Sequence, residues 1–293
     1  MSLSEIFLKN KPALSFEFFP PKTEKGEQNL YRHVERLVEC SPDFVTCTYG
    51  AGGSTRDKTL DIVTHIKRQF GVPVASHLTL VDSTVEQLQS YLDQSAERDV
   101  DFIVALRGDP PKGAEEFVPV PGGLQYANEL VELIQRQYPR FGVAVAGYPE
   151  VHREAVSAQQ DLLNLKRKVD AGADVVITQL FYHNDDFFRF CDQCRDVGIE
   201  VPIVAGLLPV ISLKQIQRIA GLCGAKLPQS FIDRLSQHDD PQWQFQVGVE
   251  QAVQQTEALL EQGIDGLHFY VLNRSDAAHA ILQAVDIASV RAS

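Results

Sequence analysis

Short runs of β-branched and aromatic residues alternate along the chain with longer stretches in which apolar residues recur every three or four positions. Period-two and continuous apolar runs are typical of strands, and a spacing of three and four is typical of helices. The short runs predict eight strands, at 14–19, 44–49, 73–80, 102–106, 143–147, 175–181, 203–208 and 267–272. The longer stretches predict a helix after each strand, among them 59–70, 84–98, 124–137, 158–170, 185–197 and 213–223.

Regular alternation of strand and helix predicts the fold class. Each strand–helix–strand unit favours a right-handed crossover and a parallel sheet, and eight such units are the number that closes a barrel. We therefore expect an α/β protein with one (βα)8 TIM barrel that forms a single catalytic domain over residues 1–293. The alternative is a doubly wound open sheet. The interval between strands seven and eight is extended, with Pro228–Pro241 and a helix near 246–262.

The net charge and the composition limit the kinds of partner and the cell compartment that we expect. The formal net charge of −12 disfavours nucleic acid and an anionic membrane surface, because basic patches supply most of that affinity. No segment approaches the roughly 20 apolar residues of a membrane helix, and the N-terminus lacks a signal-peptide layout. The five cysteines are an odd number spread through a long chain, which suits a reducing compartment. We expect a cytoplasmic protein without nucleic-acid or membrane partners.

Polar side chains gather at the carboxyl ends of the predicted strands, where parallel barrels place their active sites. Glu17 is the most informative of them. Side chains alternate along a strand, so Glu17 shares a face with Ser15, while the apolar Phe16 and Phe18 share the other. Glu17 should then point into the barrel mouth, where partial burial raises its pKa toward a useful general-acid range. The alternative is a solvated carboxylate at a strand end.

Other strand ends carry weaker signals. Arg107 and Asp109 lie in phase, and Gly108 between them allows a ligand to approach the backbone closely. The alternative there is a structural Arg–Asp pair. His77 and Gln179 could equally be hydrogen-bonded residues of the barrel interior.

The helix at 158–170 presents a possible anion site. Asp161, Asn164 and Lys168 fall on one side at helical spacing, with Arg167 adjacent. A cationic edge beside the barrel mouth could hold a pyrophosphate, and the alternative is an ordinary solvated helix face.

Several nucleotide and metal motifs are missing. The chain contains neither a G-x-G-x-x-G after a strand nor a Walker A loop. Cys191 and Cys194 form a C-x-x-C inside a helix pattern, without a second pair at zinc-finger spacing. We interpret these cysteines as structural and expect no metal site.

Seven segments, in this order, resemble one family. They are 15–21 (SFEFFPP), 48–51 (TYGA), 105–109 (ALRGD), 148–152 (YPEVH), 161–168 (DLLNLKRK), 177–179 (ITQ) and 268–274 (HFYVLNR). On these segments the chain resembles methylenetetrahydrofolate reductase in its short bacterial form, the catalytic barrel only, along nearly its whole length.

The resemblance implies an activity in one-carbon metabolism. It implies a flavoprotein with noncovalent FAD, and NADH or NADPH as cosubstrate. Reduction of 5,10-methylenetetrahydrofolate to 5-methyltetrahydrofolate would proceed by a ping-pong hydride relay through FAD and supply methyl groups for methionine synthesis. A folate partner and a homo-oligomer are expected. Because the chain ends at Ser293, no regulatory domain and no adenosylmethionine feedback are expected.

The resemblance also assigns residues. Glu17 matches the general acid, and Asp109 matches a catalytic charge that favours the folate iminium cation. The cofactor positions are Thr48, Tyr49, Ala51, His77, Arg107, Gly108, Asp109, Tyr126, Ala127, Tyr148, His152, Ala155, Asp161, Asn164, Arg167 and Lys168. The folate positions are Asp109, Gln179, Gln215 and Arg274, and the nicotinamide positions are Thr48 and Gln179.

One position departs from the family. Ile219 falls where some bacterial members carry an aromatic ring that stacks on nicotinamide and folate. Two other classes stay open: another FAD-dependent barrel oxidoreductase, such as a proline dehydrogenase-like enzyme, and a non-redox pterin-binding methyltransferase barrel.

Overall fold

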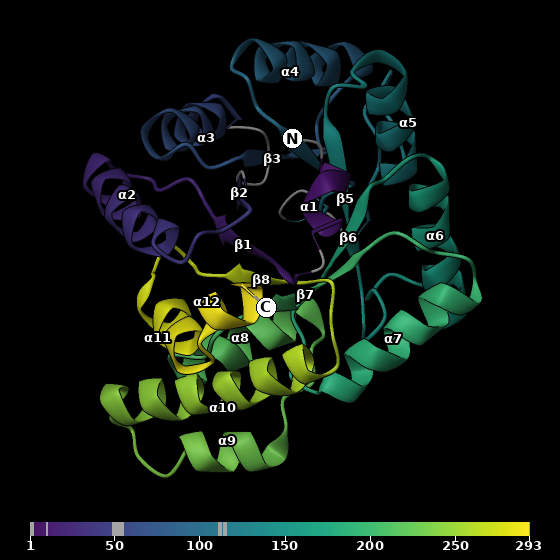
Figure 1. The fold of residues 1–293 in the computed structure, drawn as a ribbon. Helices are drawn as coiled ribbons and strands as arrows, with labels where there is room; N and C mark the ends of the chain where they lie inside the picture. The colour runs from purple at the N-terminus through teal and green to yellow at the C-terminus, as the bar shows by residue number, and fades with distance from the viewer. Residues whose placement is uncertain (1–2, 10, 49–55, 111–112, 114–115, 293) are drawn as a thin grey trace.

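The computed structural model describes residues 3–9, 11–48, 56–110, 113 and 116–292. Within these ranges, eight parallel strands form a closed barrel in chain order, with β8 pairing back to β1 (Figure 1). This confirms the predicted α/β barrel. The strands are β1 (Ala13–Phe18), β2 (Phe44–Cys47), β3 (Val74–Thr79), β4 (Phe102–Leu106), β5 (Gly142–Gly147), β6 (Val175–Thr178), β7 (Ile203–Leu207) and β8 (Gly266–Tyr270).

Helices surround the barrel (Figure 1). They are α1 (Leu3–Phe7), α2 (Glu24–Val38), α3 (Arg56–Phe70), α4 (Val85–Glu97), α5 (Ala127–Gln137), α6 (Ala158–Asp170), α7 (Asn184–Asp196), α8 (Leu213–Cys223), α9 (Gln229–Leu235), α10 (Pro241–Glu261), α11 (Asp276–Ala284) and α12 (Ile287–Ala292). The predicted extension between strands seven and eight contains α9 and α10, which lie side by side (Figure 1).

Two apolar layers hold the barrel together. The larger lies between strands and helices and includes Leu14, Phe16 and Phe18, as strand alternation predicts. The smaller fills the barrel interior. There Leu3 and Ile6 of α1, both about 1% exposed, close the amino-terminal end of the barrel. The sequence pattern did not predict α1, because five residues are too few to show a helical period.

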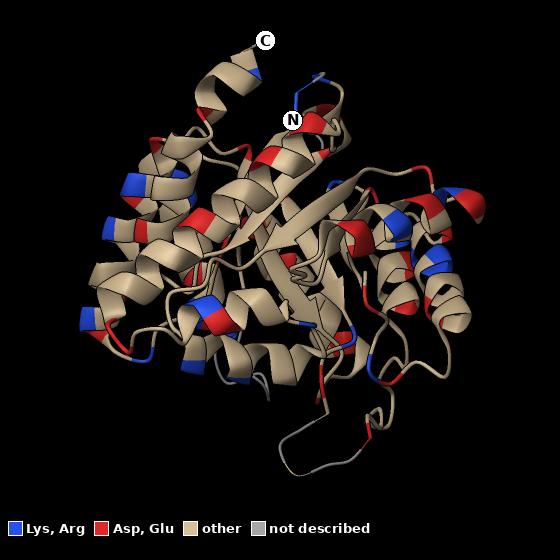
Figure 2. Ribbon diagram, turned by 90° about the horizontal axis from the view of Figure 1, so that it is seen from below, with Lys and Arg blue, Asp and Glu red and all other residues tan. Residues whose placement is uncertain are grey.

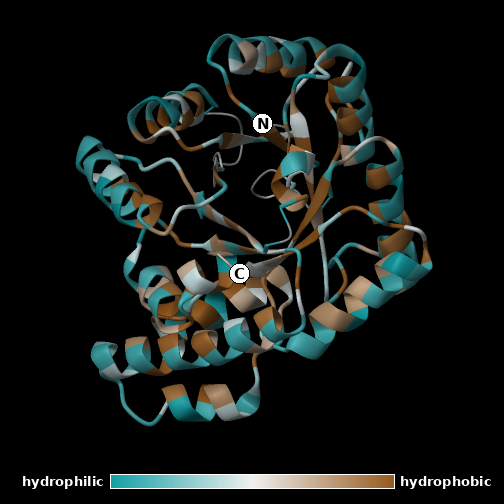
Figure 3. Ribbon diagram, viewed as in Figure 1, coloured by the Kyte–Doolittle hydropathy of each residue, from teal (hydrophilic) through white to brown (hydrophobic). Residues whose placement is uncertain are grey.

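Charged residues lie mainly on the helices and loops around the strands (Figure 2). The helices turn hydrophobic residues inward and hydrophilic residues outward, which is the amphipathic pattern of a helix packed on a core (Figure 3). Among the described residues, we find no helix with the length and apolar character needed to span a membrane.

Four aspartates lie at the amino-terminal end of the barrel, each directly before an even-numbered strand. Their carboxylates accept hydrogen bonds of 2.7–2.9 Å from backbone N–H groups near the start of the preceding odd-numbered strand. The pairs are Asp43 with Leu14, Asp101 with Val74, Asp174 with Val143, and Asp265 with Ile203. We call these four residues the basal aspartates. They join the barrel strands in pairs at the end opposite the predicted site.

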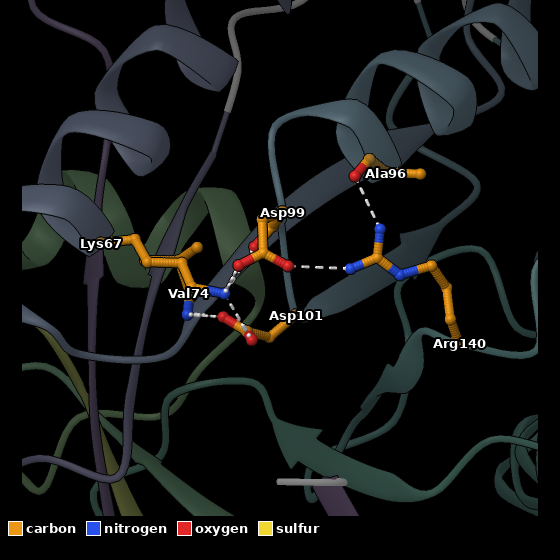
Figure 4. Close-up of polar contacts among 6 residues, drawn as sticks. All are labelled: Lys67, Val74, Ala96, Asp99, Asp101 and Arg140. Carbon is orange, nitrogen blue, oxygen red and sulfur yellow. Dashed lines mark hydrogen bonds and ion pairs between the residues drawn. The ribbon is translucent and has the colours of Figure 1, made fainter.

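Figure 4 shows the surroundings of one basal aspartate. Lys67 Nζ lies 2.8 Å from a carboxylate oxygen of Asp101 and 2.8 Å from one of Asp99. Arg140 contacts Asp99 at 3.1 Å and donates to the Ala96 carbonyl at 2.6 Å. The network connects α3 to the loop that precedes β4.

Candidate functional site

The carboxyl ends of the strands surround a cavity of about 840 Å3. Its wall contains residues that lie in, or directly after, all eight strands, together with residues of α5, α6 and α8. This volume lies in the range of small-molecule and cofactor sites.

Most of the residues that the sequence singled out meet in this cavity. They are Glu17, Thr48, His77, Arg107, Gly108, Asp109, Tyr126, Ala127, Tyr148, His152, Asp161, Asn164, Arg167, Lys168 and Gln179. Tyr49 and Ala51 lie outside the described residues. Ala155, Gln215 and Arg274 are not part of the cavity wall; Arg274 borders a smaller cavity that shares Leu208, Tyr270 and Leu272 with it.

Glu17 lies between two histidines from other strands. One carboxylate oxygen, Oε2, is 3.3 Å from His77 Nε2 and 3.5 Å from His268 Nε2. The other ring nitrogen of His268 is 2.7 Å from Ser15 Oγ. The barrel register explains this arrangement, because Ser15 pairs with His268 across β1 and β8, and Glu17 lies two residues further on.

The pKa of Glu17 differs from the sequence prediction. Burial by itself raises this pKa, as expected. The charges of His77 and His268 and their hydrogen bonds to the carboxylate lower it by more than burial raises it, so that the pKa falls to about 2. The prediction of a raised pKa was therefore wrong for this state of the protein. The two histidines therefore favour the ionised form of the Glu17 carboxyl in the unliganded cavity.

Arg107 and Gly108 shape the cavity at the end of β4. Arg107 Nη2 lies 2.7 Å from Glu154 Oε2, and its guanidinium lies 5.2 Å from the centre of the Phe117 ring. Among the described residues, its ion pair is thus formed with Glu154 and not with Asp109, which is exposed. Gly108 has φ +89°, and a Cβ there would lie 2.6 Å from Val81 Cγ2, so a larger residue would be strained.

The polar face of α6 borders the same cavity. Asp161 accepts the backbone N–H of His152 at 2.8 Å, and Asn164 Oδ1 accepts from Arg167 at 2.9 Å. Lys168 Nζ donates to the Ala146 carbonyl at 2.5 Å. Burial lowers the pKa of Lys168 to about 8, against the opposing effect of Asp161. A partly buried ammonium whose hydrogen bond goes to a neutral carbonyl fits an anionic group such as a pyrophosphate.

Another part of the wall is apolar, and we call it the apolar half of the cavity and the part beside α6 the polar half. Leu180, Leu208, Leu272 and Ile219 line it. Ile219 lines the cavity from α8, so the position expected to carry an aromatic ring in some bacterial members of the resembled family reaches the site here with an aliphatic side chain. Tyr270 also lies here, and its hydroxyl donates to the Thr178 carbonyl at 2.7 Å.

The apolar residues and His268 were not singled out as site residues from the sequence. Leu180, Leu208 and Leu272 look like ordinary strand-end core residues. His268 was part of a matching segment, and its even spacing from Tyr270 was the signal that places both on the inner face of β8.

Cys191 and Cys194 lie in α7, outside the cavity wall. Burial raises the pKa of each thiol to about 12, which disfavours the reactive thiolate form. Within the described ranges, no group of three His, Cys, Asp or Glu side chains is arranged to hold a metal ion.

Comparisons with known proteins show the family to which the chain belongs. Residues 2–286 match the family model for methylenetetrahydrofolate reductase. The chain is 39% identical to 5,10-methylenetetrahydrofolate reductase of Escherichia coli over 289 residues, 98% of this chain and 94% of that protein. It is 40% identical over 291 residues to "methylenetetrahydrofolate reductase (NADH) 1" of Arabidopsis thaliana, 96% of this chain. The chain spans about half the length, 49%, of this plant relative.

Solved structures share the fold at low sequence identity. An uncharacterized protein from Clostridium thermocellum that binds two copies of 5-methyl-5,6,7,8-tetrahydrofolic acid aligns with a TM-score of 0.66 at 18% identity, over 98% of this chain and 99% of that one. Dihydropteroate synthase from Xanthomonas albilineans aligns with a TM-score of 0.53 at 17% identity, over 96% and 93%. These likenesses support the barrel fold.

Proposed function

Because the chain belongs to the methylenetetrahydrofolate reductase family, we propose that it reduces 5,10-methylenetetrahydrofolate to 5-methyltetrahydrofolate, with FAD as cofactor and a reduced nicotinamide as donor. The observation that carries the proposal is the composition of one cavity. It combines a carboxyl group between two histidines, an exposed carboxylate at Asp109, and a cationic helix face at Lys168. These are the parts that acid-assisted reduction of a folate beside an anionic cofactor requires.

The polar half of the cavity would hold the cofactor. Lys168 and Arg167 of α6 would offer positive charge to its phosphates, and Tyr126 and His152 line the same cavity. Gly108 would allow the chain to turn at the end of β4 beside the cofactor, because it has a left-handed φ of +89° and a Cβ there would meet Val81. When bound, FAD supplies the hydride transfer, and the protein orients the reactants and places charge around them.

Glu17 would deliver the proton. The five-membered ring of the folate opens when its departing nitrogen receives a proton, and the carboxyl of Glu17 points into the cavity with His77 and His268 behind it. A substrate that fills the cavity would exclude water and thereby raise the pKa of the carboxyl, which favours the protonated form of Glu17 that can donate to the nitrogen. Asp109 would favour the resulting cation by its charge.

The test separates the two half-reactions of the FAD-loaded protein. Glu17→Gln keeps the shape of the side chain and removes its transferable proton. We expect NADH to reduce the flavin at close to the wild-type rate, while reoxidation by methylenetetrahydrofolate slows by about 10²–10⁴-fold. Stopped-flow absorbance at the flavin band measures both steps.

Two further variants sharpen the result. Glu39→Gln removes a carboxylate on the exposed surface of the molecule and should leave both steps unchanged. Asp109→Asn should slow the folate step and weaken folate binding more than it slows flavin reduction. Wild-type protein that takes up no flavin, or that reduces no folate, would end the proposal. A Glu17→Gln variant that is reoxidised at wild-type speed would remove Glu17 as the acid.

A further inference from the structure

Phe19 is an exposed aromatic residue to which the proposed reaction assigns no role. Among the described residues, two aromatic side chains belong to the large exposed hydrophobics, Phe19 at 41% and Tyr126 at 54%, and both line the cavity. Tyr126 lies in the half proposed for the cofactor. An exposed ring at the mouth of a ligand cavity is a candidate contact for that ligand, because its burial on binding is favourable.

The backbone at Phe19 is held on both sides. The side chain of Asn273 accepts the Phe19 N–H at 3.0 Å through Oδ1 and donates to the Phe19 carbonyl at 2.7 Å through Nδ2. Asn273 has φ 57°, a left-handed conformation that asparagine tolerates well. Pro20 and Pro21 follow and restrict the backbone further. The ring is therefore presented from a fixed position, which lowers the entropic cost of using it in binding.

Phe19 lines the same cavity as Glu17. It comes directly after β1 and lies in phase with Glu17, two residues earlier. β1 neighbours β8, and Phe19 and Leu272, which follow these two strands, both line the cavity, so we assign Phe19 to the apolar half. The polar residues of α6 belong to the other half.

Other rings near this half are already engaged. Phe18 is fully buried in the layer between strands and helices. Tyr270 donates to Thr178 and packs edge-on against His268, with ring centroids 5.1 Å apart. Ile219 offers no aromatic face from α8. Among the described residues of the cavity wall, Phe19 is then the exposed ring that remains besides Tyr126.

We propose that Phe19 provides the aromatic surface against which the flat pterin ring of the folate packs, in the absence of an aromatic side chain on α8. The proposal rests on the function proposed above. It makes Phe19 a binding residue that orients the substrate ring beside Glu17.

The test is equilibrium binding of 5-methyltetrahydrofolate to the FAD-loaded protein, measured by titration calorimetry. Phe19→Ala should raise the dissociation constant on the order of tenfold, since aromatic contacts contribute beyond the area that they bury. Phe19→Tyr should bind like the wild type. Phe19→Leu, which keeps apolar area without an aromatic face, should fall between them. Leu8→Ala truncates an exposed apolar residue outside the cavity wall and should leave binding unchanged.

A second substitution, at Ile219, tests whether an aromatic ring on α8 can replace Phe19. If Phe19 substitutes for an aromatic ring on α8, adding Ile219→Phe to Phe19→Ala should recover most of the lost affinity. Equal dissociation constants for wild type, Phe19→Ala and Phe19→Leu would overturn the inference. If Phe19→Ala does not fold, equal affinities of Phe19→Leu and wild type are sufficient to overturn it. Wild-type protein without affinity for the folate would instead contradict the proposed function itself.

Discussion

Lys168 couples protonation to cofactor binding at the scale of a single residue. Burial lowers its pKa from the ordinary 10.5 to about 8, so the unliganded protein begins to lose this positive charge at mildly alkaline pH. An anionic phosphate binds the protonated form more tightly. The affinity for FAD should therefore fall as pH rises above about 8.

The same pKa shift has the opposite effect on the stability of the unliganded protein. Between pH 8 and 10.5 the unfolded chain keeps the proton on Lys168 while the folded chain loses it. The unfolded state then binds more protons, so the contribution of this side chain to the free energy of unfolding rises with pH. Cofactor affinity and the stability of the unliganded protein should thus change in opposite directions.

Lys168→Met is the matching change, because it keeps the length of the side chain and removes its charge. Loss of a charge-assisted contact of ~1.5–3 kcal/mol should weaken FAD binding roughly tenfold to a hundredfold at pH 7. Fluorescence titration of FAD from pH 7 to 9 measures it. The wild-type affinity should decline across this range and that of the variant should stay flatter. Parallel profiles would show that another group causes the pH dependence.

Glu17 shows what a local pattern can predict about a residue. Strand alternation was enough to place it in the barrel mouth beside Ser15. The direction of its pKa shift depends on His77 and His268, which lie 60 and 251 residues away and reach Glu17 through the closed barrel. Burial could be inferred from neighbours in the sequence, whereas these charges could not.

At the scale of elements, side chains of the loop after β5 contact the end of α8 and the segment that follows it. Arg153 donates to the Leu222 carbonyl at 2.7 Å, at the carboxyl end of the helix. Glu150, whose side chain is 8% exposed, accepts the Lys226 backbone N–H at 3.0 and 3.2 Å. The loop also contains His152 of the cavity wall, so these contacts connect the proposed cofactor side to the helix that carries Ile219.

Arg153→Ala should loosen α8 and impair the substrate side more than the cofactor side. A cation at a helix carboxyl end contributes ~0.5–1 kcal/mol, so we expect a two- to fivefold higher KM for the folate with kcat and FAD content little changed. Arg153→Lys should recover part of the effect. Arg189→Ala, which removes an exposed arginine paired within α7, serves as the control. A loss of FAD with unchanged KM would show that the loop does not act through α8.

The pattern predicted elements better than their ends. All eight strands were predicted, yet β2, β6 and β8 end two or three residues before the apolar runs do. At β8 the reason is visible, since Leu272 and Asn273 adopt left-handed backbone angles that end the strand. The helix α5 begins at Ala127 rather than 124 because Glu129 accepts the backbone N–H groups of Gln125 and Tyr126. Such caps depend on side-chain contacts that apolar periodicity does not contain.

At the scale of the whole molecule, the barrel separates stability from chemistry. The cavity lies at the carboxyl ends of the strands, and the basal aspartates lie at the amino ends. Their sequence signal is visible afterwards, because an aspartate directly precedes each even-numbered strand. Its meaning could not be inferred before the fold was known, since each carboxylate binds the backbone of a strand about 30 to 60 residues earlier.

Asp101 allows this separation to be tested. Asp101→Ala removes the acceptor of the Val74 N–H and one partner of Lys67, so it should lower the free energy of unfolding by about 2 kcal/mol. Asp101→Asn keeps an acceptor and should cost less. Asp99→Asn removes the charge of an exposed partner of the same lysine at a left-handed position, φ 58°, that asparagine tolerates, and should cost less than about 1 kcal/mol. Urea unfolding measures the order of these effects.

The same variants should leave the kinetic constants of the folate reaction close to wild type at temperatures where they are folded, because Asp101 acts at the opposite end of the barrel. Equal urea midpoints for Asp101→Ala and Asp99→Asn would mean that the hydrogen bond to Val74 adds nothing beyond a surface ion pair. A fall in kcat/KM for Asp101→Ala, with stability unchanged, would mean that the amino end of the barrel influences the site. In a parallel barrel each strand joins the two ends directly. Stability and kinetic constants must therefore be measured on the same set of variants, because only the two measurements together show whether the basal aspartates stabilise the barrel alone or also position the catalytic residues.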